Sequence, residues 1–454
     1  MSEKKINDNM ILHGPVVGAI VSFALPLFIG NLFQQLYNTA DALIVGNLLG
    51  NSALASVTAT GNLVWLLVGF FEGIAIGAGV VVSRYFGAGD YGTLKKVIYT
   101  DILFSLAMGI VLTIFGTLFT PAILRLMGTP EDIFDTAADY IRIYFAGGIG
   151  LVMYNSLRGI LQAVGDSRHP LIYLVVSSVT NIVLDILFIA VFHGGVGSAA
   201  VATIISQFIS ALLCLRKLLK SDGPYTLCIS EMRADFSRMK EIVHYGLPTG
   251  LQNSAIAIAN VVVQSNINAF GTMAVSGCGS YSKIEGFAFL PITSFVMAIT
   301  TFVGQNLGAR QYARAKKGSG AGVIFAMGIA ELIGAVIYVS APVLIRAFTS
   351  EPEAIAFGVQ KARICSVFYF LLAASHSLSA VLRGAGKPTI PMITMFAVWC
   401  VIRVSILAVF VPIFKSILIV NWVYPITWCI STVVLALYYF KSDWIHGFEN
   451  TGRM

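Results

Sequence analysis

The amino-acid sequence predicts an all-α polytopic membrane protein, with twelve transmembrane helices in two six-helix lobes that are parallel repeats. Three observations predict this fold: an apolar composition, twelve apolar segments of spanning length, and an internal repeat. Of the 454 residues, 57% are hydrophobic and only 11% are charged, whereas soluble domains carry roughly 25% charged residues. The chain is therefore expected to lie in a lipid bilayer.

Twelve segments are long and apolar enough to span a membrane. A bilayer core of about 30 Å requires roughly 20 apolar helical residues per crossing. The predicted spans are 15–45, 54–84, 94–120, 134–162, 169–192, 195–219, 240–269, 276–305, 318–346, 354–382, 389–412 and 417–440.

Basic residues gather in alternate loops. The predicted odd-numbered loops hold only Arg125, Arg346 and Lys415, whereas the even-numbered loops and their flanks, with residues such as Arg158 and Arg168, hold most of the others. Cytoplasmic loops of membrane proteins are enriched in Lys and Arg. Both termini are therefore expected to be cytoplasmic. The same distribution explains the net charge of +7, so this charge does not indicate that the protein binds nucleic acid.

The sequence repeats itself after about half its length. Residues 82–96 (VSRYFGAGDYGTLKK) resemble 303–317 (VGQNLGARQYARAKK), and Leu25-Pro26 corresponds to Leu247-Pro248. We expect lobes at 1–219 and 240–454, joined by a cytoplasmic linker at 220–239. Because six is an even number, the lobes enter the membrane in the same sense, as in transporters that alternate access by rocking one lobe against the other.

The first span carries a polar stripe. Asn31, Gln34, Asn38 and Asp41 are spaced i, i+3, i+7 and i+10, which places them on one helix face. A lipid-facing stripe of this kind would cost several kcal/mol, so it is expected to face the lobe interior or a watery cavity. The amides alone would suit an interhelical seam, whereas the aspartate favours a functional site.

A second polar face lies on the fifth span. Ser177, Asn181 and Asp185 repeat every four residues, and Asp185 is expected at nearly the same membrane depth as Asp41. Two such carboxylates would titrate as a pair, or bind a small cation such as sodium among amide and hydroxyl oxygens. Thr203, on the sixth span, is a further possible oxygen ligand.

The repeat does not duplicate the carboxylates. Asp41 and Asp185 correspond to Val263 and Ile406 in the second lobe, whereas Asn38 corresponds to Asn260. The asymmetry favours a specific task for the first lobe.

Other membrane-embedded residues support less definite expectations. Pro26 and Pro248 lie within the first helix of each lobe, where each is either a hinge or a static kink. Glu285 is expected to contact substrate from the second lobe. The sequence alone leaves the roles of Glu72, Glu331 and Arg403 open.

Five segments carry a family resemblance: ALPLFIGNLFQQLYNTADALIVG (24–46), VSRYFGAGD (82–90), LRGILQAVGDSRHP (157–170), VGQNLGARQ (303–311) and LRGAGKP (382–388). Together, in this order, they resemble the multidrug and toxic compound extrusion (MATE) family along essentially the whole chain. The resemblance implies a V-shaped, twelve-helix antiporter in the plasma membrane of a prokaryote. It would export organic, often cationic and amphipathic, compounds in exchange for protons or sodium ions.

Within that family the chain is most similar to the prokaryotic DinF-like branch. The resemblance implies a first-lobe coupling-ion site at Asp41, Asn181 and Asp185, with Asn155 as its helix 4 member. We add Asn38 and Thr203 to this site, and place Asn31, Gln34, Tyr37, Asn260 and Glu285 in the substrate cavity. Segments 252–266 and 366–382 hold no acid, so the second-lobe sodium site of the other prokaryotic branch is not expected.

Other functional classes are disfavoured. The sequence has no phosphate-binding GxxxxGK[ST] motif, no Ser-His pairing and no metal-ligand cluster, so neither an ATP motor nor an enzyme is expected. We expect a monomer without cofactor, driven by an ion gradient. The alternative is a lipid-linked oligosaccharide or other amphiphile flippase of the same superfamily, whose cavity would favour arginines over acids.

Overall fold

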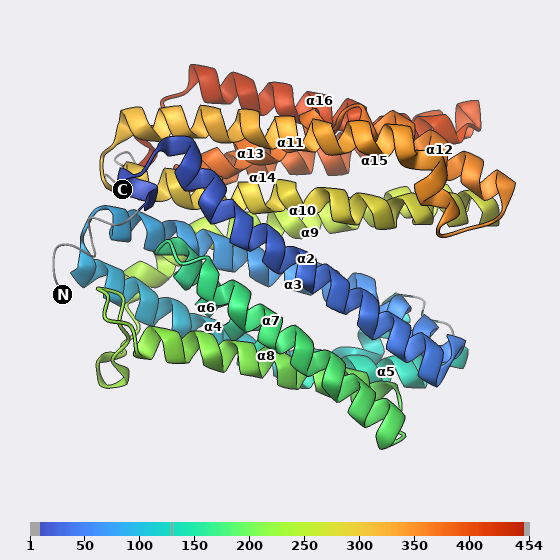
Figure 1. Ribbon diagram of the computed structural model, residues 1–454, viewed down its shortest axis with the longest axis horizontal. Coiled ribbons are helices and arrows are strands. Elements are labelled where there is room, and N and C mark those ends of the chain that lie inside the picture. The colour runs from blue at the N-terminus through green and yellow to red at the C-terminus, as the bar shows by residue number, and fades with distance from the viewer. Residues whose placement is uncertain (1–9, 128, 130, 449–454) are drawn as a thin grey trace. The chain divides into compact units, whose positions relative to one another are not determined.

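The protein is described by a computed structural model over residues 10–127, 129 and 131–448, and this part of the chain is almost entirely helical (Figure 1). Each of the twelve predicted spans is found as a helix or an interrupted helix, which confirms the all-α fold. The terminal segments predicted to be cytoplasmic, 1–9 and 449–454, lie outside the described residues. The elements of the first half are α1 (Met10–His13), α2 (Val16–Leu49), α3 (Asn51–Gly87), α4 (Tyr91–Leu126), α5 (Glu131–Ala146), α6 (Gly148–Ala163), α7 (Arg168–Asp185), the π-helix η2 (Ile186–Val191), α8 (Val196–Leu219) and η3 (Ile229–Glu231).

The second half repeats this order of helices. It consists of α9 (Phe236–Asn268), α10 (Thr272–Gly308), α11 (Tyr312–Arg346), α12 (Pro352–Ser366), α13 (Tyr369–Gly384), α14 (Thr389–Met395), the π-helix η4 (Phe396–Ile402), α15 (Arg403–Phe414) and α16 (Ile417–Lys441).

In the part of the chain that the structure describes, up to ten helical spans are long and apolar enough to cross a membrane. Within the described residues, nine helices pass individually, and α12 with α13, bent by 53° at their junction, makes a tenth. The other two predicted spans are helical but do not pass. Helix α9 is long enough yet carries polar amides, including Gln252 and Asn260, whereas α5 and α6 are separate helices of 16 residues interrupted at Gly147.

The described chain forms two compact units. One comprises residues 29–250, and the other comprises 10–28 together with 251–448. In the first unit α6 packs against α3, α4 and α8, and in the second α10 packs against α11, α12 and α13. The units differ from the two halves of the sequence because the first part of α2 belongs to the second unit, and the first part of α9 belongs to the first.

Both unit boundaries follow a proline. The boundary in α2 lies between Phe28 and Ile29, two residues after Pro26, and the boundary in α9 lies between Gly250 and Leu251, two residues after Pro248. Proline within a helix removes one backbone hydrogen bond and allows a bend. The repeated prolines therefore lie where each helix passes from one compact unit into the other.

Within the first unit, the start of α9 packs closely on α3. A Cβ atom added to Gly77 would lie 2.3 Å from the Cα of Gly246, and one added to Gly73 would lie 2.5 Å from the Cα of Gly250. Small residues spaced four apart let helix backbones approach in this way. Glu241 adds an ion pair to Arg84, with 3.3 Å between Oε1 and Nη1.

The start of α2 is fixed within the second unit. Arg314, on α11, donates hydrogen bonds to the carbonyl oxygens of Ile11 and Gly14, at 3.0 and 2.6 Å from Nη2. Ile20 of α2 is buried and approaches Gly322 of α11. The first part of α2 and the first part of α9 are thus each held by side-chain contacts within the unit to which they belong.

Candidate functional site

The polar stripe of α2 is partly buried. Asn31, Gln34, Tyr37 and Asp41 are half-buried, whereas Asn38 is exposed. The side chains of Gln34 and Tyr37 form a hydrogen bond, and Asp41 is an electrostatic neighbour of Tyr37. The structure therefore brings Gln34, Tyr37 and Asp41 together and leaves Asn38 on an exposed face.

Asp41 and Asp185 lie side by side in the first unit. Their carboxyl groups are within hydrogen-bonding range of each other, and Asp185 is fully buried. Oδ1 of Asp41 and both carboxylate oxygens of Asp185 accept no hydrogen bond from the described residues. Because carboxylates have no proton to donate, this contact becomes a hydrogen bond only when one of the two groups is protonated.

Asp185 lies where the α-helix changes to a π-helix. It is the last residue of α7, and the π-helix η2 starts at the next residue. π-Helical turns are rare and often occur at functional sites. The π-helical turn begins directly after Asp185, inside the span that the sequence predicts as one continuous helix.

Asn181 and Thr203 extend the site towards α8. Nδ2 of Asn181 lies 3.4 Å from Oγ1 of Thr203, which itself donates to the carbonyl oxygen of Ala199 at 3.0 Å. Asn181 is buried, and its Oδ1 has no partner among the described residues. An unpaired amide oxygen one helical turn before Asp185 is available to a proton donor or a small cation.

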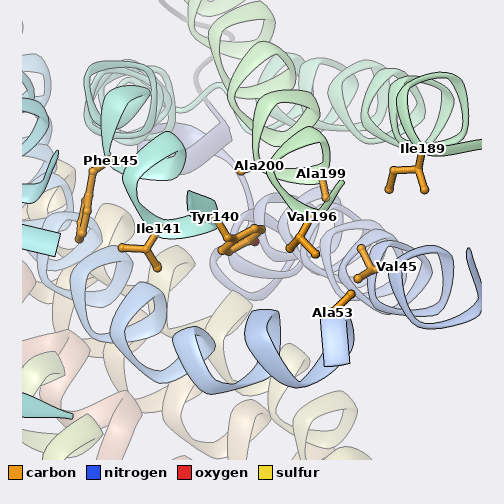
Figure 2. Packing of buried hydrophobic residues seen from close by; sticks show 9 residues of the cluster. All are labelled: Val45, Ala53, Tyr140, Ile141, Phe145, Ile189, Val196, Ala199 and Ala200. Atoms are coloured by element: carbon orange, nitrogen blue, oxygen red, sulfur yellow. The ribbon is translucent and has the colours of Figure 1, made fainter. Parts of the chain in front are cut away.

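Sequence reasoning missed Tyr140. This tyrosine of α5 is buried in an apolar cluster with Val45 and Val196 (Figure 2), and both Asp41 and Asp185 are among its electrostatic neighbours. The pair Tyr140 and Tyr144, four residues apart on a predicted helix, is the signal that could have indicated a polar edge here. The packing of α5 brings a phenol to the carboxylate pair.

Asn155 belongs to a different network. Its Nδ2 donates to the carbonyl oxygen of Leu151 at 2.9 Å, and its Oδ1 accepts from Nη2 of Arg158 at 3.2 Å. Arg158 also contacts Glu72, with 2.8 Å between Nη2 and Oε1. Within the described chain, no hydrogen bond joins Asn155 to Asp41 or Asp185.

The same network corrects one assignment and supplies one partner. Arg158 is not a cytoplasmic loop charge, because it is buried within α6. Glu72, whose role the sequence left open, is its ion-pair partner.

In the second unit, the counterparts of the carboxylates are apolar. Val263 is fully buried in a cluster with Leu407, and Ile406 packs against that cluster. Asn260 is half-buried on α9. The structure thus places hydrophobic packing where the first unit has its acid pair.

Glu285 lies in a polar cluster of the second unit. Its Oε1 accepts a hydrogen bond from the Tyr281 hydroxyl at 2.9 Å, and this hydroxyl lies 2.9 Å from that of Tyr369. Two cations, Lys361 and Arg403, are its electrostatic neighbours. Glu331 has another role, because its Oε2 accepts from the backbone N–H of Phe370 at 3.2 Å, next to the first residue of α13.

Comparison with known proteins identifies the family to which this chain belongs. The MatE family profile matches the chain twice, over residues 26–187 and 248–409. The chain belongs to the MatE family. The two matched segments start at Pro26 and Pro248, the prolines that precede the two unit boundaries.

Two relatives of this MatE protein are from Bacillus subtilis. The "Probable multidrug resistance protein YoeA" of Bacillus subtilis is 28% identical over 426 residues, which cover 92% of each chain. The "Probable multidrug resistance protein YpnP" of the same organism is 30% identical over 399 residues, 88% of this chain and 89% of its own length.

A solved structure agrees with the MatE fold. The chain is similar to the structure of a MOP superfamily transporter from Pyrococcus furiosus, with 27% identity and a TM-score of 0.88 over 94% of this chain and 96% of the other. The binding pocket of that transporter has reverse polarity. The chain is therefore a multi-pass membrane protein of a multidrug efflux family, and family membership implies transport of small molecules.

Proposed function

We propose that this MatE protein is a secondary antiporter that exports organic, amphipathic and cationic compounds in exchange for protons or sodium ions. The observation that carries the proposal is the contact between the Asp41 and Asp185 carboxyl groups, three of whose oxygens accept no hydrogen bond from the described residues. Such a pair cannot easily hold two negative charges, so it binds a proton or a cation.

The geometry favours the proton. Carboxyl groups within hydrogen-bonding range attract each other when they share a proton and repel each other when both are ionised. Sodium would require several oxygen ligands around one point, and Asn181 and Thr203 are the nearby oxygen donors. Proton coupling is therefore the first expectation, and sodium coupling is the alternative that the experiment distinguishes.

The site and the two prolines support the following transport cycle. When the coupling ion binds Asp41 and Asp185 in the outward-open state, α2 changes shape about Pro26 and the substrate is released. Pro248 supplies the corresponding bend in α9. Inward ion movement then drives outward substrate movement, with both termini on the cytoplasmic side.

The test separates the two gradients. The protein is reconstituted in vesicles, a pH gradient or a sodium gradient is imposed alone, and transport of a panel of cationic dyes is measured. We expect the pH gradient to drive transport by the wild type and not by Asp41→Asn or Asp185→Asn. Asp139→Asn is the matched control, because Asp139 is an exposed carboxylate of α5.

Two outcomes would contradict the proposal. Concentrative transport at the wild-type rate by Asp41→Asn would show that the coupling site lies elsewhere. Failure of both gradients to drive any of the dyes would exclude ion-coupled export of cationic compounds.

A second candidate is an amphiphile flippase of the same superfamily. One observation favours it: the second unit buries Lys361 and Arg403, and a phosphate group would pair with such cations. Gradient-independent translocation of a phosphate-bearing lipid between leaflets, together with indifference to Asp41→Asn, would support this candidate over the antiporter.

A further inference from the structure

The second unit buries two cations in its interior. Lys361 of α12 is 2% exposed and Arg403 is 0% exposed. Arg403 is the first residue of α15 and follows directly on the π-helix η4. Lysine and arginine are almost never fully buried unless they are paired, so the partners of these two side chains decide what the cluster does.

Aromatic rings provide part of the surroundings. Lys361 Nζ lies 5.0 Å from the ring centroid of Tyr424 and 5.5 Å from that of Tyr281. The Arg403 guanidinium lies 4.8 Å from the Tyr424 ring and 4.5 Å from the Trp399 ring. Because both cations contact the Tyr424 ring, α12, α15 and α16 bring two positive charges to one place.

The acids of this unit do not balance that charge. Glu285 is an electrostatic neighbour of both cations. Among the described residues, no carboxylate lies within ion-pair distance (4.0 Å) of Lys361 or Arg403. Glu331 is occupied by the Phe370 N–H. Two cations facing one carboxylate leave one positive charge uncompensated, and a buried uncompensated charge is strongly unfavourable.

A donor group of the cluster is also unsatisfied. Nε and Nη2 of Arg403 lie 3.3 and 2.7 Å from Oγ1 of Thr427, whereas Nη1 has no hydrogen-bond partner among the described residues. A fully buried guanidinium nitrogen without an acceptor is costly. An acceptor with negative charge would satisfy both the donor and the excess charge.

We propose that Lys361 and Arg403 form a binding subsite for an anionic oxygen group, a carboxylate or a phosphate, on an amphipathic cargo. Arginine suits such groups because its planar fork matches their oxygens. The rings of Tyr281 and Tyr424 would contact the apolar part of the cargo, and Glu285 limits the net charge of the subsite. This inference rests on the proposed export function and names one chemical group that the cargo carries in addition to its cationic group, so the cargo is zwitterionic.

The first experiment compares two forms of one dye. Equilibrium binding to the purified full chain is measured by fluorescence anisotropy for a rhodamine that bears a free carboxylate and for its methyl ester. We expect the wild type to prefer the free acid, and Lys361→Met and Arg403→Met each to weaken acid binding by about tenfold or more while leaving ester binding almost unchanged. Lys283→Met is the control, because Lys283 is an exposed cation of α10.

The second arm distinguishes the source of the anionic group. Binding of a fluorescent phosphatidic acid is compared with that of the matching diacylglycerol, which lacks the phosphate. A preference for the phosphate-bearing lipid alone assigns a phosphate cargo, and a preference for the carboxylate dye alone assigns an organic acid. Wild-type protein that prefers neither anionic form would overturn the proposal.

A variant that is expected to tighten anion binding separates a binding role of the two cations from a loss of structure. Glu285→Gln removes the negative charge that neighbours both cations, so it should tighten binding of the anionic probe, an effect that a loss of structure cannot produce. If Arg403→Met does not yield monodisperse protein, Glu285→Gln and Arg403→Lys decide the question. Unchanged or weaker anion binding by Glu285→Gln would contradict the proposal. Equal changes in acid and ester binding by Lys361→Met and Arg403→Met would show that the two cations only stabilise the packing of the helices.

These measurements are independent of coupling. Equilibrium binding requires no gradient, so these measurements test the anion subsite whether or not a pH gradient drives export. Loss of coupled transport with intact anion binding would overturn the antiport proposal alone.

Discussion

Nη2 of Arg158 lies 2.8 Å from Oε1 of Glu72, and this ion pair joins α6 to α3 inside the first unit. Arg158 is buried, whereas the Glu72 side chain is 36% exposed. Arg158 also donates to Asn155, so its loss would leave two acceptors without their partner.

The first prediction concerns this pair. Arg158→Met should lower the free energy of unfolding by about 1–3 kcal/mol, less than for a fully buried pair because water still reaches Glu72. Thermal unfolding in detergent measures the change. The double variant Glu72→Gln/Arg158→Met should recover part of the loss, and a double variant as unstable as the sum of the single ones would argue against a direct interaction.

The second prediction concerns the coupling pair. Asp41→Asn and Asp185→Asn should each abolish concentrative transport, and the double variant should be no worse than either, because the two carboxyl groups act as a unit. Gradient-driven dye transport is the measurement. Residual concentrative transport by either single variant that the double variant lacks would mean that the two aspartates serve separate sites.

The third prediction concerns the contact between α3 and α9. In Gly77→Ala the new Cβ would lie 2.3 Å from the Cα of Gly246, so backbone must move and the protein should lose about 1–3 kcal/mol of stability. Gly328→Ala is the control, because no heavy atom lies within 4 Å of its Cβ position. The control should be neutral or slightly stabilising, and equal losses in both variants would contradict the close approach.

The fourth prediction concerns the hinge. Pro248→Ala restores a helix donor in α9 and should slow transport while leaving stability equal or higher. Pro342→Ala, also inside a helix but within the second unit, should transport like the wild type. Wild-type transport by Pro248→Ala would show that the bend is static.

The fifth prediction concerns a helix start between two candidate membrane spans, Leu66–Gly87 and Tyr91–Arg125. Asp90 precedes α4, and its side chain accepts a hydrogen bond from the Thr93 N–H at 3.1 Å. This bond lowers the pKa of Asp90. The stabilisation is therefore fully present above the ordinary aspartate pKa of about 3.9 and is lost as the pH falls through the lower, folded-state value.

Asp90→Ala tests that assignment. The variant should be about 1 kcal/mol less stable near neutral pH, and the difference from the wild type should shrink at the acidic end of a thermal unfolding series. A difference that stays constant down to the lowest pH would show that the carboxylate charge does not contribute.

The sequence by itself determined the helices, the repeat and the polar faces of the first lobe. Asp41 and Asp185 were predicted to meet because helix periodicity fixes the face of each residue and topology fixes its depth. These are properties of a single chain segment or of its order in the membrane, so a pattern of residue types is enough to show them.

Only the tertiary structure decided which faces meet. The boundaries two residues after Pro26 and Pro248 depend on which bundle each half-helix packs against. The meeting of Lys361 and Arg403 at Tyr424 depends on how three helices are rotated about their axes. Side-chain packing between distant segments sets those rotations, and the periodicity of one segment records only the face that it offers.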